Sequence, residues 1–274
     1  MDSVVAIDWL VNYLDDPNVV IIDCRFQLSD PSWGRKQYEA SHIPNAYYLD
    51  LNQDLSSPVQ KHGGRHPLPN PETLAAKLAN MGIHSSQTQV IAYDDSRCAF
   101  AARLWWLLRY LGHDQVAVLN GGWNAWQNAG YPTTSEIPPA KTGDFMPQVR
   151  QDWVVNREGV KARQKDPNAV IIDSRDGDRY RGEREPIDPV AGHIEGAVNF
   201  PWKTVTDEQG NIYSPSEQRQ RWLEGEMAID ESQEKIVYCG SGVTACVNLL
   251  SLHLAQLNQG KLYAGSWSDW CSYL

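Results

Sequence analysis

Short runs of apolar and often β-branched residues recur along the chain at Val19–Asp23, Val90–Tyr93 and Val116–Leu119. Each run is continuous rather than alternating, which is typical of strands buried on both faces of a parallel sheet. Segments with a helical pattern occur at Pro71–Met81 and, more strongly, at Phe100–Leu111. This alternation predicts an α/β fold in which a mainly parallel sheet is flanked by helices.

The same succession of segments occurs twice in the chain. The copies keep one order throughout and are offset by about 144–151 residues, so the repeated unit is a whole domain rather than a short solenoid repeat. Four pairs of segments carry the repeat: Val19–Arg25 with Ala169–Arg175, His42–Ala46 with His193–Ala197, Val90–Tyr93 with Lys235–Tyr238, and Gly122–Trp126 with Ser266–Trp270.

A stretch without hydrophobic periodicity separates the copies. Residues 131–150 contain four prolines, which is typical of an extended and semi-rigid connector. We therefore predict an N-terminal domain over residues 1–132, a linker over 133–150 and a C-terminal domain over 151–274.

Composition excludes several classes of partner. The formal net charge is −10, whereas nucleic-acid binding requires a basic surface, so no nucleic-acid partner is expected. The sequence has no run of 18 apolar residues, so no membrane span is expected either. The N-terminus lacks the basic start and cleavage site of a signal peptide.

The cysteines form neither a metal-binding pattern nor a disulfide pattern. Their number is odd, their spacing is wide and they include no C-x-x-C pair, so reduced thiols in the cytoplasm are the simplest interpretation. They are Cys24, Cys98, Cys239, Cys246 and Cys271.

The two copies differ in the loop that follows their second matching strand, which is where parallel α/β sheets bind ligands. In the second copy this loop contains Cys239, Gly240 and Gly242 and precedes an apolar helical segment over 245–256. Glycines allow the backbone to turn its N–H groups inward, and such a ring of amides at a helix N-terminus favours a thiolate and would also hold a persulfide. In the first copy Asp94 replaces the cysteine, so this domain is expected to be catalytically silent.

The sequence resembles the two-domain sulfurtransferases of the rhodanese superfamily over nearly its whole length. The loop CGSGVTA at 239–245 is similar to the active-site loop of 3-mercaptopyruvate sulfurtransferases, whereas thiosulfate sulfurtransferases carry larger basic residues at its second and third positions. Both D-x-R strand ends and both HI-x-x-A segments also match this superfamily. The resemblance implies two tandem rhodanese-like domains.

The resemblance also implies a ping-pong reaction at Cys239. This residue would take sulfur from 3-mercaptopyruvate or thiosulfate as a persulfide and pass it to cyanide or a thiol, with thioredoxin as one candidate acceptor. Ser241 and His42 match a serine–histidine relay, for which Asp30 is a candidate acidic member. Because His193 occupies the place of His42 in the other copy, a purely structural role for His42 is the alternative.

Substrate binding is implied for a further group of residues. Arg179 matches an arginine that pairs with the carboxylate or sulfonate of the donor, for which a planar guanidinium is suited. A second arginine of the mercaptopyruvate enzymes is absent, because Ile187 or Asp188 stands in its place, and Arg184 is a nearby substitute. This difference leaves the donor open. The loop residues expected to line the sulfur site are Gly240, Gly242, Val243 and Thr244.

A phosphatase, a persulfide carrier and a redox sensor are the alternatives to a sulfurtransferase. A related phosphatase would carry an arginine six residues after its cysteine, where this chain has Ala245. A persulfide carrier that delivers sulfur to a partner protein stays open. A redox sensor would need a resolving thiol, and Cys246 lies about two helical turns from Cys239. No metal or organic cofactor is expected. The Asp–Arg motifs at 23–25 and 173–175 occur in both copies, which favours internal ion pairs.

Overall fold

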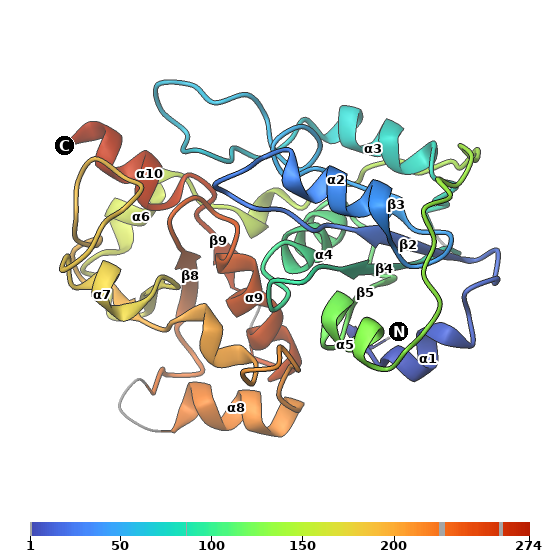
Figure 1. The fold of residues 1–274 in the computed structure, drawn as a ribbon. Helices are drawn as coiled ribbons and strands as arrows, with labels where there is room; N and C mark the ends of the chain where they lie inside the picture. The colour runs from blue at the N-terminus through green and yellow to red at the C-terminus, as the bar shows by residue number, and fades with distance from the viewer. Residues whose placement is uncertain (1, 86, 225–227, 258–259) are drawn as a thin grey trace. The chain divides into compact units, whose positions relative to one another are not determined.

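The computed structural model describes residues 2–85, 87–224, 228–257 and 260–274 and divides into two compact units (Figure 1). Unit 1 consists of Met1–Ser57, Leu68–Arg150 and Glu208–Ile212, and unit 2 of Pro58–Pro67, Gln151–Asp207 and Tyr213–Leu274. The short segment Pro58–Pro67 thus belongs to unit 2 although it lies in the first half of the sequence.

Unit 1 contains a five-stranded parallel sheet in the order β1-β5-β4-β2-β3. Its strands are β1 (Val4–Val5), β2 (Val19–Asp23), β3 (Tyr47–Tyr48), β4 (Gln89–Tyr93) and β5 (Val116–Leu119). Its helices are α1 (Ile7–Val11), α2 (Trp33–Ala40), α3 (Pro71–Ala79), α4 (Ala101–Tyr110) and α5 (Gly122–Asn128). All three predicted strands and both predicted helices are therefore present, with small differences at their ends.

Unit 2 contains a four-stranded parallel sheet in the order β7-β6-β8-β9. Its strands are β6 (Ala169–Asp173), β7 (Val198–Asn199), β8 (Glu234–Tyr238) and β9 (Lys261–Leu262). Its α-helices are α6 (Arg157–Arg163), α7 (Gly177–Tyr180), α8 (Pro215–Leu223), α9 (Ala245–Leu254) and α10 (Ser266–Trp270). Three short 3-10 helices complete it: η1 (Gln151–Trp153), η2 (Trp202–Val205) and η3 (Cys271–Tyr273).

The continuous apolar runs form central strands, as predicted. Every residue of β2 is buried, and its neighbour β4 is buried except at its first residue. On one face, Leu10 of α1 and Trp126 of α5 pack with Ile21 and Ile91 of these strands. Figure 1 shows α1 and α5 together on the same side of this sheet. A strand covered on both faces cannot alternate polar and apolar residues, which explains the sequence pattern.

The predicted internal ion pairs are present in both units. Arg25 donates from Nη2 to Oδ2 of Asp23 over 2.7 Å, and Arg175 makes the same contact with Asp173 over 2.6 Å. Arg25 also donates to the carbonyl oxygen of Ser41, and Arg175 to that of Gly192. Each pair therefore ties the end of a central strand to the residue that precedes an HI-x-x-A segment, and this explains why both motifs occur in both copies.

The predicted linker lies along unit 1 as an extended segment. Its residues 133–150 form no helix and no strand of a sheet. Thr134 forms an isolated β-bridge with His42, and Lys141 forms one with Met81. Near its end, the amide of Gln148 donates to the carbonyl oxygen of Leu111 over 2.8 Å. Repeated backbone contacts with unit 1 therefore hold this proline-rich segment.

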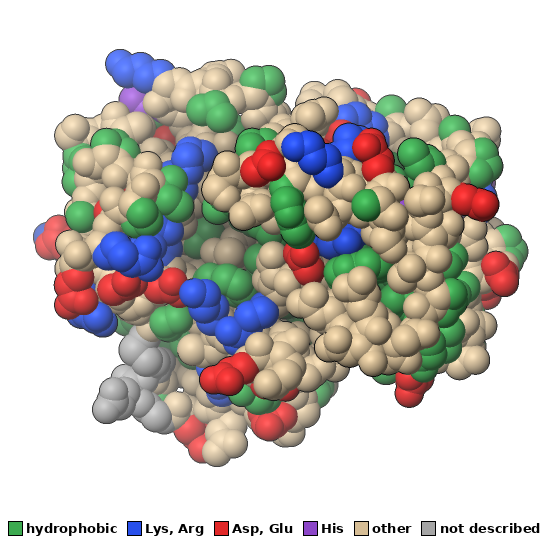
Figure 2. Space-filling model, in the orientation of Figure 1, with side chains coloured by type: hydrophobic (Ala, Val, Ile, Leu, Met, Phe, Trp, Pro, Cys, Tyr) green, Lys and Arg blue, Asp and Glu red, His purple; other side chains and the backbone are tan. Residues whose placement is uncertain are grey.

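None of the helices in the described part of the chain is both long enough and apolar enough to cross a membrane. Within the same residues, no group of three or more His, Cys, Asp or Glu side chains could hold a metal ion. Figure 2 shows acidic and basic side chains intermixed on the visible face, without one continuous basic patch.

Candidate active site at the Cys239 loop

Cys239 directly follows β8 and begins the loop that leads into α9. Its side chain is buried, and the backbone N–H of Gly242 donates to its Sγ over 3.2 Å. Gly242 has a φ of +77°, and a Cβ at this position would lie 2.4 Å from the carbonyl oxygen of Ala264. Only glycine allows this turn and this close approach, so the glycine aims an amide at the sulfur.

The start of α10 holds the Cys239 loop in place. The amide of Cys239 donates to Oγ of Ser266 over 3.1 Å, and the carbonyl oxygen of Cys239 accepts from the amide of Trp267 over 3.0 Å. The carbonyl oxygen of Gly240 accepts from the amide of Ser268 over 2.9 Å. The repeated C-terminal motif at 266–270 thus fixes the backbone of the loop through three hydrogen bonds.

Further backbone donors of this loop are unused. Among the described residues, the amides of Ser241, Val243 and Thr244 have no acceptor. Thr244 is the N-cap residue of α9, but its side chain makes no capping hydrogen bond. The loop therefore combines free amides with the positive end of a ten-residue helix, an arrangement that favours a bound anion.

In unit 1 a carboxylate occupies the corresponding position. Asp94 follows β4, and its two oxygens accept four backbone N–H groups at 2.8–3.0 Å. The donors are Ser96, Cys98, Phe100 and Ala101. Burial nevertheless raises the pKa of Asp94 to about 6. The amides around this loop are thus used by the protein's own side chain.

Ser241 has a histidine partner that sequence reasoning missed. Its Oγ lies 2.7 Å from Nδ1 of His66, which belongs to the segment Pro58–Pro67 of unit 2. This segment contacts the C-terminal region, because the amide of Gly63 donates to Asp269 over 2.7 Å. Gly64 has a φ of +85° and packs directly on the carbonyl oxygen of Gly265. The only sequence signal was a polar run outside the repeat.

Both ring nitrogens of His42 face carbonyl oxygens of its own unit. His42 is fully buried in unit 1, where its Nδ1 lies 2.6 Å from the carbonyl oxygen of Tyr38 and its Nε2 lies 3.1 Å from that of Glu136. His193 contacts Tyr180 in the same way, over 2.7 Å. Both histidines therefore connect a helix to the HI-x-x-A turn, which favours the structural role of His42.

Asp30, the candidate acidic member, precedes α2 in unit 1. It accepts from Oγ of Ser32 over 2.6 Å in an exposed turn, and the hydroxyl of Ser32 lowers the pKa of Asp30. Its contacts are local to the segment before α2.

The two candidate substrate-binding arginines have different surroundings. Arg179 is largely buried and donates from Nη2 to Glu185 over 2.6 Å. Its Nη1 would lie 3.6 Å from a Cβ built on Gly240, so the guanidinium borders the Cys239 loop. Arg184 is instead half-exposed and pairs with Asp178 over 2.6 Å. The structure thus places only Arg179 beside the loop.

A second guanidinium at the loop comes from a residue that the sequence did not indicate. Arg65 Nη2 would lie 3.1 Å from a Cβ on Gly240. Arg65 forms an ion pair with Asp188, and burial raises the pKa of this carboxyl. Arg65 therefore occupies the neighbourhood in which Arg184 had been expected.

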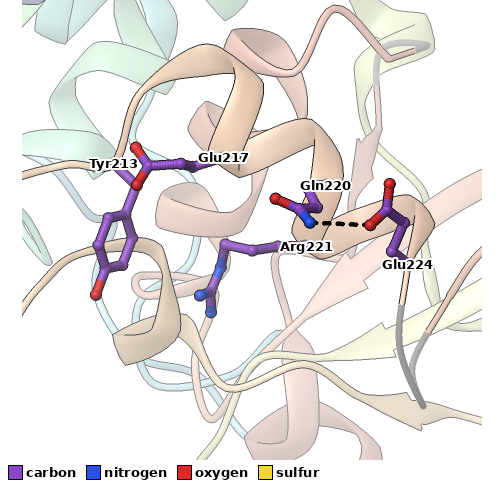
Figure 3. Close-up of a pocket in the computed structure, with 5 residues that line it drawn as sticks. All are labelled: Tyr213, Glu217, Gln220, Arg221 and Glu224. Carbon is purple, nitrogen blue, oxygen red and sulfur yellow. Dashed lines mark hydrogen bonds between the residues drawn. The ribbon is translucent and has the colours of Figure 1, made fainter.

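A separate groove of about 480 Å³ lies along α8 (Figure 3). In it Gln220 donates to Glu224 over 2.9 Å, and the guanidinium of Arg221 lies beside the ring of Tyr213. Its lining residues are Tyr213, Glu217, Gln220, Arg221 and Glu224. They include neither a nucleophile nor a candidate site residue.

Comparison with known proteins agrees with this architecture. Residues 6–129 and 156–273 each match the Rhodanese-like domain. A Pseudomonas aeruginosa protein named a probable 3-mercaptopyruvate sulfurtransferase is 44% identical over 262 residues, which cover 94% of this chain and 90% of that protein. The thiosulfate sulfurtransferase of Rattus norvegicus is 31% identical and covers 98% of this chain and 91% of its own length.

A solved structure shows the same fold. The crystal structure of SseA from Escherichia coli, whose description concerns 3-mercaptopyruvate sulfotransferases, superimposes with a TM-score of 0.84 and 32% identity. The match covers 98% of this chain and 100% of that one. The predicted α/β architecture and the resemblance are both confirmed: this chain belongs to the rhodanese family of sulfurtransferases and contains two tandem rhodanese-like domains.

Proposed function

We propose that Cys239 is the sulfur-carrying nucleophile of this enzyme. The observation that carries the proposal is the hydrogen bond from the Gly242 amide to the Cys239 sulfur, in a loop where the amides of Ser241, Val243 and Thr244 have no acceptor among the described residues. A persulfide adds a second, anionic sulfur atom, which the free amides of Ser241, Val243 and Thr244 would stabilise. Because Asp94 uses the matching amides of unit 1, that domain would be silent.

The reaction has two halves. The Cys239 thiolate attacks the sulfur of 3-mercaptopyruvate, an S–S bond forms while the donor's C–S bond breaks, and pyruvate leaves as an enolate that takes up a proton. Cyanide or a thiolate then attacks the outer sulfur, so the product carries that sulfur and the Cys239 thiolate is regenerated.

The Ser241–His66 pair favours 3-mercaptopyruvate as the donor. An enolate leaving group needs a proton, and a hydroxyl hydrogen-bonded to an imidazole can transfer one. Thiosulfate releases sulfite, which needs no proton. Arg179 would bind the donor's carboxylate beside Gly240.

The acceptor and the setting are also proposals. A small thiol or thioredoxin would accept the sulfur, and all five cysteines are free thiols, as expected for an enzyme of the reducing cytoplasm. The alternative of a persulfide carrier differs only in the acceptor. Steady-state rates with cyanide, compared with rates with thioredoxin or another protein acceptor, separate the two.

Mass spectrometry tests the proposal directly. After treatment with 3-mercaptopyruvate and removal of excess donor, the peptide that contains Cys239 should gain the mass of one sulfur atom. Cys239→Ser should gain none, and Cys246→Ser should behave as the wild type. No gain with either donor, or a gain that persists in Cys239→Ser, would rule out the proposed role.

A further inference from the structure

Two guanidinium groups border the loop that carries the nucleophile. A Cβ built on Gly240 would lie 3.1 Å from Nη2 of Arg65 and 3.6 Å from Nη1 of Arg179. Because Gly240 follows Cys239 directly, both cations border the loop to which an anionic donor must bind. Arg65 comes from the segment Pro58–Pro67, which lies far from the other two residues in the sequence.

One buried carboxylate links these two arginines. Oδ1 of Asp188 pairs with Nη1 of Arg65, and its Oδ2 lies 3.4 Å from Nη2 of Arg179. The side chain of Asp188 is only 2% exposed. Its backbone is held by Glu185, whose Oε1 accepts from the Asp188 amide over 3.1 Å.

Each guanidinium keeps one unbonded nitrogen toward the loop. In the part of the chain that the structure describes, Nη2 of Arg65 and Nη1 of Arg179 have no hydrogen-bond acceptor. These are the two nitrogens that lie near Gly240. The carboxylates of Glu185 and Asp188 therefore leave these two Nη groups free to donate hydrogen bonds. Their main effect is on the net charge beside the loop.

The formal charges at the loop cancel. Arg65 and Arg179 contribute two positive charges, and Glu185 and Asp188 contribute two negative ones. Both carboxylates are almost fully buried, so salt screens them less than exposed groups. A sulfur donor with one carboxylate can accept hydrogen bonds from the two free Nη groups and brings only one negative charge to this neutral region. A dianionic donor brings two negative charges and finds no net positive charge to balance them.

We propose that Asp188 sets the donor specificity of this enzyme by neutralising one of the two guanidinium groups beside Cys239, so that donors with one negative charge are favoured over dianionic donors. The proposal rests on the proposed function. It assigns Arg65 and Asp188 as specificity-determining residues. The chemistry at the sulfur atom is unchanged by it.

The primary test is Asp188→Asn, which removes the charge and keeps the shape. The ratio of kcat/KM for thiosulfate to kcat/KM for 3-mercaptopyruvate should rise about tenfold, because one positive charge becomes uncompensated. Asp114→Asn is the matched control. It makes the same change in net charge at an exposed ion pair of unit 1 and should leave the ratio unchanged.

A second variant changes the charge in the opposite direction. Arg65→Gln should lower the same ratio, and the double variant Arg65→Gln/Asp188→Asn should return it close to the wild-type value. If Arg65→Gln also disturbed the neighbouring His66, the reaction with 3-mercaptopyruvate would slow, because its enolate needs a proton. The ratio would then rise, so this side effect cannot produce the expected fall. If Asp188→Asn does not fold, Arg65→Gln decides the matter.

The outcomes separate this inference from the proposed function. If the Cys239 persulfide forms in every variant but the ratio stays constant, Asp188 does not set specificity. If the wild type forms no persulfide, the proposed function itself fails. A rise with Asp188→Asn, a fall with Arg65→Gln and recovery in the double variant together support the inference.

Discussion

Nδ1 of His66 lies 2.7 Å from Oγ of Ser241, although the two residues are 175 positions apart in the sequence. Both side chains are buried, so the hydrogen bond is shielded from water. Ser241 stands two residues after Cys239, and under the proposed function the pair would give the departing enolate its proton. His42 differs from His66, because both of its ring nitrogens contact backbone carbonyl oxygens of unit 1.

His66→Ala should lower kcat/KM with 3-mercaptopyruvate by about 100-fold, which is typical of losing a positioned proton donor. The loss with thiosulfate should be smaller, because sulfite leaves without a proton. Steady-state assays with both donors measure the difference. His42→Ala should instead reduce stability by about 1–3 kcal/mol, since it removes a buried side chain that bonds two carbonyl groups. Equal kinetic losses in the two variants would contradict this assignment.

Cys239→Ser should abolish sulfur transfer, whereas Asp94→Asn should leave it almost intact. The carboxylate of Asp94 accepts from backbone amides of the loop and of the start of α4, and it cannot carry sulfur. Both variants should be assayed with 3-mercaptopyruvate and cyanide after circular dichroism has confirmed folding. A large loss in folded Asp94→Asn would show that unit 1 takes part in the reaction.

The stability of the protein should depend on pH through Asp94. Burial raises its pKa to about 6, whereas the pKa of aspartate in an unfolded chain is about 3.9. The native state therefore binds this proton more tightly, and the stability contributed by the protonated carboxyl is lost as the pH rises from about 4 to about 6.

Urea unfolding of the wild type and Asp94→Asn tests this dependence. The free energy of unfolding of the wild type should fall by about 2 kcal/mol relative to the variant between pH 4 and pH 7. A difference between the two proteins that stays constant across this range would mean that Asp94 titrates normally.

Arg179→Ala should raise the KM for 3-mercaptopyruvate about tenfold or more, because the donor's carboxylate loses a partner and Glu185 keeps only its ion pair with Arg175. Arg179→Lys should recover part of the loss. Arg184→Ala should change KM little, since Arg184 pairs with Asp178 in an exposed position. A larger effect from Arg184 than from Arg179 would reverse the assignment.

Asp23→Ala should destabilise the protein by about 3–5 kcal/mol, because it leaves the buried guanidinium of Arg25 without its carboxylate. Asp114→Asn, at an exposed pair with Arg150, should cost less than about 1 kcal/mol. Denaturant unfolding followed by tryptophan fluorescence measures both. Similar values for the two variants would mean that the buried pair contributes no more than a surface pair.

Local patterns were enough to predict the architecture and to single out Cys239 as the candidate nucleophile. The apolar runs predicted central strands because burial on both faces leaves no place for alternation. The glycine loop around Cys239 could be recognised because Cys239, Gly240 and Gly242 are neighbours in the chain, and their geometry depends on backbone freedom. The Asp23–Arg25 pair was equally accessible, since its partners are two positions apart.

The sequence alone thus determined the duplicated α/β fold, the strand ends and the glycine-rich loop that carries the candidate nucleophile Cys239, all of which arise from contacts between near neighbours. Only the tertiary structure decided which residues face that loop. Arg65 and His66 lie in an aperiodic segment of the first half that folds with unit 2, and Asp188 has partners far away in sequence. Long-range contacts of this kind leave no periodicity or spacing, so they appear only when the chain is folded.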